Sequence, residues 1–351
     1  MGFKRFDPED LVISNDAVTS TVWSNNTPTL TDFYTSSIQV VSNNAEYYYD
    51  VYQTASTDDT AAVQFSVAYC DIEGSGSRFY NALVTGSSPT RTNYGQYRTL
   101  ILGDENASFV FGNQSSSYFY VINVERARYK ESLLPGTMTL YVSGSGGRQV
   151  LTDDSKLGNA TVFTDAGRRY NLVSGSAGNI YTGVNTNGWT SNSGSYGWFL
   201  PDVGLILLSG EALDGAYASA QGIGLNTTRS FDSASFNQGK LIDGFNAAGN
   251  ASLGFTLNSK ETLSSDFVFV RARNSEFNYS EDPAFISGST GEVLFNSFID
   301  DPKTYITTVG LYNDNSELLA VAKLSRPLQK DFTKELLVRV KLDFWYLVIN
   351  L

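Results

Sequence analysis

Carboxylates are the only serious catalytic candidates in this 351-residue sequence, because the chain contains no histidine. That absence excludes a Ser-His-Asp triad, a Cys-His pair and histidine metal sites. Two carboxyl groups are enough for glycoside hydrolysis, and adjacent acidic pairs occur at Asp58-Asp59, Asp153-Asp154 and Asp300-Asp301. Neighbours in a strand point to opposite faces, and in loops such residues more often cap turns. We therefore expect no enzymatic activity.

The other reactive groups give no clearer signal. Cys70 is the single cysteine, so no intrachain disulfide can form, and we interpret it as a small buried hydrophobe. No phosphate-binding or dinucleotide-binding glycine motif is present. Residues 313–317 place several oxygen ligands close together but lack the spacing of a calcium loop. We predict no cofactor and no bound metal.

Charge and hydropathy restrict the partners. The 24 Lys and Arg residues against 36 Asp and Glu residues give a formal net charge of −12, which argues against nucleic acid as a partner. No segment approaches the ~18 consecutive apolar residues of a membrane span, and no secretory signal is visible at the N-terminus. We expect a soluble protein made in a cytoplasm, with neither nucleic acid nor membrane as a partner.

The elements that would position these residues are strands. The chain holds 22 Phe, 21 Tyr and 31 Gly, a composition typical of strands joined by turns. Strict alternation over residues 63–69 puts Val63, Phe65, Val67 and Tyr69 on one face. Similar β patterns cover residues 118–124, 138–142, 267–270 and 336–342. We predict an all-β fold of antiparallel β-sandwich domains, with long loops and at most short helices.

A soft boundary near residue 283 divides the chain. We predict a main β-sandwich region over 1–282, with a further split near 150 left open, and a C-terminal β domain over 283–351 for attachment or assembly. Residues 210–254 are rich in Gly, Ala, Ser and Asn and lack strong strand signals, which suggests a long excursion. Pro327 could open a short helix within residues 326–335.

Interface residues are expected in the C-terminal part, where apolar runs flank the polar connection 313–316 as in a hairpin. The two arginines of the Arg-Ala-Arg sequence are added because Arg is favoured at subunit contacts. The predicted interface set is Val309, Leu311, Tyr312, Leu318, Leu319, Val321, Trp345, Tyr346, Arg126 and Arg128. Trp189, Tyr196 and Trp198 could form an aromatic platform for a glycan, although core or interface packing is the favoured interpretation of these rings.

Residues 305–314 and 318–324 resemble a pattern in tailed-phage baseplate and tail-fibre attachment proteins. The pattern is a strand ending in Val-Gly-Leu-Tyr, an acidic turn and a second strand that contains Leu-Ala-Val. More broadly, the chain resembles virion structural proteins of the large contractile-tailed phages of marine cyanobacteria. That broader likeness is carried by residues 6–14, 21–24, 94–100, 125–130, 199–204 and 285–293.

The resemblance implies a structural component of the virion, assembled in the host cytoplasm. Its favoured place is the tail, the baseplate or the region that connects the fibres. Its implied partners are other virion proteins and copies of itself, as a homo-oligomer within a symmetric particle. Two alternatives stay open: a capsid decoration or neck protein, and a host-glycan-binding adhesin or depolymerase.

Overall fold

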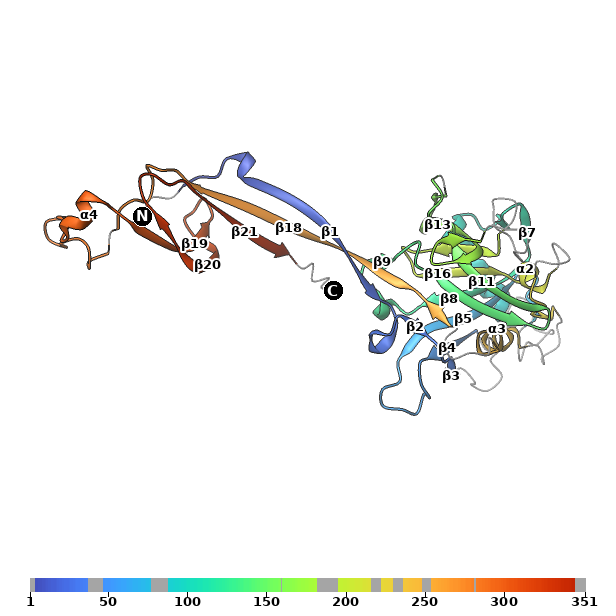
Figure 1. Cartoon of the computed structure of the whole chain (residues 1–351). Coiled ribbons are helices and arrows are strands. Elements are labelled where there is room, and N and C mark those ends of the chain that lie inside the picture. Colours follow the sequence, from blue (N-terminus) through green and yellow to red (C-terminus); the bar gives the residue numbers. More distant parts are fainter. Residues whose placement is uncertain are drawn as a thin grey trace. The chain divides into compact units, whose positions relative to one another are not determined.

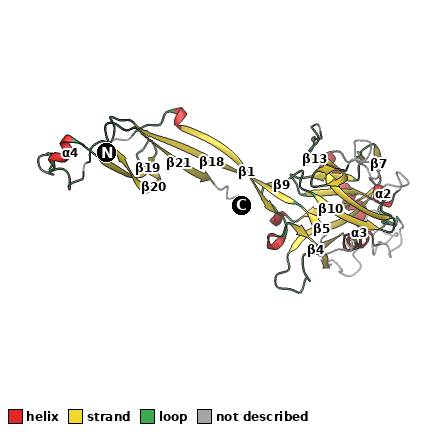
Figure 2. Ribbon diagram, viewed as in Figure 1, coloured by secondary structure: helices red, strands yellow, loops and turns green. Residues whose placement is uncertain are grey.

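The computed structural model describes residues 4–36, 47–76, 88–158, 160–181, 195–215, 222–229, 236–247, 254–280 and 282–344. Over these ranges the chain is all-β, as predicted, with antiparallel sheets and four short α-helices (Figure 2). Short 3-10 turns occur at Pro8–Asp10, Ser24–Asn26 and Arg126–Arg128.

The chain forms two compact units. Unit 1 combines Met1–Ala17 with Thr262–Leu351, and unit 2 is Val18–Glu261. This division differs from the predicted boundary at residue 283. The reason is strand pairing, because β21 (Leu336–Phe344) pairs with β18 (Asn258–Ala272) from Ser264 to Ala272 and so draws that earlier segment into the C-terminal unit.

Unit 2 is built on one long antiparallel sheet. Its strand order is β2 (Thr29–Leu30), β17 (Phe255–Thr256), β10 (Thr139–Gly144), β11 (Gly147–Asp153), β13 (Gly167–Ser176), β15 (Gly197–Leu200), β16 (Leu205–Ser209), β8 (Tyr118–Val124), β5 (Val63–Asp71), β4 (Tyr48–Tyr52) and β3 (Tyr34–Ser36). β12 (Val162–Thr164) and β14 (Asn179–Ile180) add to β13. β9 (Ser132–Leu133) pairs with Ser259 and Lys260 of β18.

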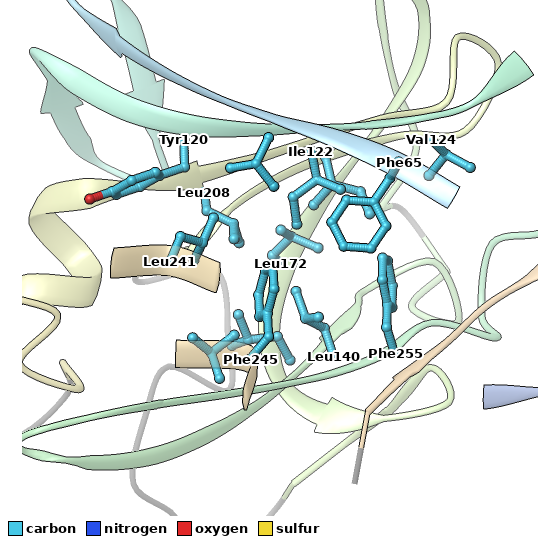
Figure 3. Close-up of a cluster of buried hydrophobic side chains, with 14 of the residues drawn as sticks. Phe65, Tyr120, Ile122, Val124, Leu140, Leu172, Leu208, Leu241, Phe245 and Phe255 are labelled. Atoms are coloured by element: carbon cyan, nitrogen blue, oxygen red, sulfur yellow. The ribbon is translucent and has the colours of Figure 1, made fainter. Parts of the chain in front are cut away.

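The inner face of this sheet holds the main core. Phe65 of β5 lies 5.9 Å from Phe255 of β17 between ring centroids, although these strands are far apart in the sheet order. The sheet therefore curls until its two ends approach each other. Phe245, from helix α3 (Asn237–Asn246), fills the interior beside Phe65, and Figure 3 shows the three rings pointing into one cluster. The predicted alternation in β5 is confirmed, since Phe65, Val67 and Tyr69 all belong to this core.

The outer face of the central strands is covered as well. Helix α1 (Pro89–Leu102) and the hairpin β6 (Phe109–Phe111)–β7 (Gln114–Ser116) pack there. The ring centroids of Tyr94 of α1 and Phe119 of β8 lie 5.4 Å apart, and those of Phe109 and Phe119 lie 4.5 Å apart. Because both faces are buried, every residue of β8 except Asn123 is inaccessible to solvent. α1 was not predicted from the sequence.

Two further expectations about local structure are wrong. The segment 210–254 is not only an excursion, because it contains α2 (Gly210–Asp214) and α3, whose Leu241 and Phe245 enter the core. The expected helix over 326–335 is absent, since the strand β20 (Leu318–Lys330) runs through Pro327. Proline is tolerated there because β20 pairs on one side only, with β19 (Thr304–Tyr312).

Unit 1 contains a sheet in the order β1-β18-β21 and the separate hairpin β19–β20, with β1 spanning Leu11–Thr21 (Figure 1). The short helix α4 (Asn296–Asp300) precedes the hairpin. Apolar side chains of the hairpin pack on those of β18 and β21, and the buried members of this cluster are Val268, Leu311, Val338 and Val340. The core of unit 1 is therefore much smaller than that of unit 2.

A buried lysine lies at the end of the hairpin. Lys330 is 0% exposed, and its ammonium group donates to the carbonyl of Asn274 at 2.9 Å, to Asn278 Oδ1 at 2.7 Å and to the carbonyl of Asp331 at 2.8 Å. These three acceptors match the three protons of the ammonium group. The lysine thus ties the turn at residues 274–278 to the last residue of β20.

We expect Lys330→Met to reduce the stability of unit 1 by about 3 kcal/mol, because it leaves two buried acceptors and the partly buried carbonyl of Asn274 without their donor. Hydrogen exchange of peptides from β19 and β20, followed by mass spectrometry, will measure the loss. Lys303→Met is the matched control, since Lys303 is exposed and pairs only with exposed Asp301. Equal protection in the two variants would contradict a structural role for Lys330.

Candidate interaction surface

The acidic pair Asp153-Asp154 accepts hydrogen bonds from backbone N–H groups. Asp153 Oδ1 accepts the N–H of Gly136 at 2.8 Å. Asp154 accepts both the backbone N–H of Asn171, at 2.9 Å, and its side-chain amide, at 3.0 Å. Burial raises the pKa of Asp154 above its usual value. Each carboxylate has its own partners, so the pair holds β11 and β13 together and does not form an acid–base couple.

In each of the two remaining acidic pairs, one carboxylate has a partner close by in the chain. Asp58 caps its own turn by accepting the N–H and the hydroxyl of Thr60, at 2.8 and 2.7 Å. Asp301 forms an exposed ion pair with Lys303 at 2.5 Å. Within the described ranges, no three Cys, Asp or Glu side chains are grouped so that they could hold a metal ion.

One ion pair with a fully buried carboxylate lies at the end of β5. Arg229 Nε donates to Asp71 Oδ2 at 2.7 Å, and Asp71 Oδ1 accepts the backbone N–H groups of Glu73 and Gly74 at 2.8 and 3.1 Å. The guanidinium lies 4.8 Å from the centre of the Tyr118 ring. Its hydrogen bond to Asp71 raises the pKa of Arg229. These groups satisfy one another, and the network is structural.

Cys70, beside this network, is buried and reduced, as predicted. Burial raises the pKa of its thiol well above the usual value, and a protonated thiol is a poor nucleophile.

The aromatic platform kept open in the sequence does not form from the residues that can be placed. Tyr196 is 0% exposed in the inner core, whereas Trp198 is 2% exposed in the cluster on the outer face. The two rings therefore belong to opposite sides of the sheet. Arg169 covers the Trp198 ring, 4.3 Å from its centre. Trp189 lies outside the described residues. Burial thus corrects the suggestion that Tyr196 and Trp198 contact a glycan.

The two predicted interface arginines have partners within the chain. Arg126 donates to the carbonyls of Tyr129 and Lys130 at 2.5 Å and stacks 4.6 Å from the centre of the Tyr129 ring. Arg128 donates to the hydroxyl of Ser24 at 2.5 Å. Both side chains fix a 3-10 turn after β8, so a further role for them at an interface stays a prediction.

The predicted residues of the hairpin divide between its two faces. Val309 and Leu311 point to the core of unit 1, where Leu311 is buried. Tyr312, Leu318, Leu319 and Val321 are between 43% and 68% exposed. We call these four exposed side chains the hairpin patch. When a two-stranded hairpin lies on a sheet, its alternate side chains face the sheet and the others face solvent.

Three members of the hairpin patch, Tyr312, Leu318 and Val321, adjoin one another. Gly310 pairs directly with Val321, and a Cβ atom at Gly310 would lie 2.9 Å from the Tyr312 ring and 3.4 Å from Leu318. Tyr312 and Leu318 therefore lie over the glycine, next to Val321. Lys323, two residues further along β20, pairs with Thr308 and extends the same face. The result is an apolar patch with a lysine at its border.

A second apolar surface lies on β1 and was not singled out in the sequence. Leu11, Val12 and Ile13 are consecutive, and all three are exposed. Successive strand residues point to opposite faces, so β1 has exposed apolar side chains on both of its faces. The small core of unit 1 contains residues of β18, β19, β20 and β21 but none of β1. We call these three side chains the β1 strip. The only signal in the sequence was the apolar run itself, which is equally typical of a buried strand.

Trp345 and Tyr346 lie outside the described residues, so their part in an interface stays a prediction. No helix in the described part of the chain is long and apolar enough to cross a membrane. Comparisons with protein-family models, with curated proteins and with solved structures found no match to this chain.

Proposed function

We propose that the chain is a structural component of a tailed-phage particle, a tail, baseplate or fibre-connecting protein that acts through the surface of unit 1. The observation that carries the proposal is the exposed apolar surface of the hairpin patch and the β1 strip. Soluble monomers rarely expose contiguous apolar patches unless the patch serves binding. A protein whose work is assembly needs such a surface and needs no reactive site.

Two further points support an assembly role. At least one carboxylate of each acidic pair accepts backbone N–H groups, caps a turn or forms an ion pair, which does not favour a pair poised for hydrolysis. The resemblance to baseplate and fibre-attachment proteins is carried by residues 305–324, the same segment that presents the hairpin patch. Burial of Tyr196 and Trp198 weakens the alternative of a glycan-binding adhesin.

The proposal is tested on purified phage particles. An antibody raised against the recombinant chain should detect it in particles banded on a density gradient, and in the tail fraction after heads and tails are separated. Detection only in the head fraction would instead favour a decoration or neck protein. Absence from both fractions, with the chain present in the infected cells, would rule out a virion role.

A further inference from the structure

We draw no further inference here: the strongest candidate, the exposed apolar surface that unit 1 presents at the hairpin patch and the β1 strip, carries none because nothing in the described part of the chain shows what covers it.

Discussion

Replacing Phe65 by alanine will lower the free energy of unfolding of unit 2 by about 3–5 kcal/mol, the range for a large buried ring. Phe65 is fully buried, and its ring contacts Trp23, Phe33, Phe245 and Phe255 at centroid distances of 5.9 to 6.1 Å. These four rings come from segments that are distant in sequence. Removing the phenyl group therefore leaves a cavity at the point where the curled sheet closes.

Urea denaturation measures the loss of unfolding free energy, and hydrogen exchange shows which elements lose protection. Peptides from β17 and α3 should lose protection, because Phe255 and Phe245 lie on these elements, while peptides from unit 1 serve as an internal reference. Phe163→Ala is the matched control, because Phe163 is 75% exposed and its removal should cost less than about 0.5 kcal/mol. A loss below about 1 kcal/mol for Phe65→Ala would show that the ends of the sheet are not held together through this ring.

The sequence revealed one face of a strand where apolar residues alternate. In β5, alternation identified Val63, Phe65, Val67 and Tyr69 as one face, and the last three lie in the main core, although Ala68 and Cys70 of the other face are buried as well. Alternation does not show what covers the second face of a strand. β8 reads as a continuous aromatic and β-branched run, so the pattern indicated a strand but not that a helix covers its second face.

That helix, α1, was missed for a physical reason. Its buried positions include Thr90 and Asn93, which a hydrophobic pattern assigns to the surface. Thr90 donates to the carbonyl of Ser75 at 3.0 Å, and Asn93 donates to the carbonyl of Tyr69 at 3.3 Å. Polar residues are buried here because long-range acceptors satisfy them, and such acceptors are not visible in a local pattern.

The interaction surface was predicted in part. The hairpin was found from its sequence, but the pattern did not separate Leu311, which is buried, from Leu319, which is 68% exposed. A β-bulge between Leu311 and Tyr312 shifts the register there, and alternation cannot anticipate a bulge. For the β1 strip, a run of three apolar residues indicates burial, but these side chains are exposed and no β1 residue belongs to the core formed by the described residues of unit 1.

The second large effect is expected at the ion pair between partly exposed Arg229 and fully buried Asp71, whose positions are 158 residues apart. Arg229→Met should reduce the stability of unit 2 by about 3 kcal/mol, because it leaves the fully buried carboxylate of Asp71 without its counter-charge. This loss of stability lies at the lower end of the range for removing one partner of a buried ion pair. The reason is that Asp71 keeps the two backbone N–H donors of Glu73 and Gly74. Urea denaturation of the purified variant measures the loss.

Two controls separate the buried charge from the lost packing of the arginine side chain. Arg168→Met breaks a partly exposed pair with Asp202, and such pairs contribute about 0–1 kcal/mol. The double variant Asp71→Asn with Arg229→Met should recover part of the stability, because a neutral amide oxygen still accepts from Glu73 and Gly74 but carries no charge to desolvate. If the double variant is no more stable than Arg229→Met alone, the loss comes from packing of Arg229 against the Tyr118 ring rather than from the stranded carboxylate.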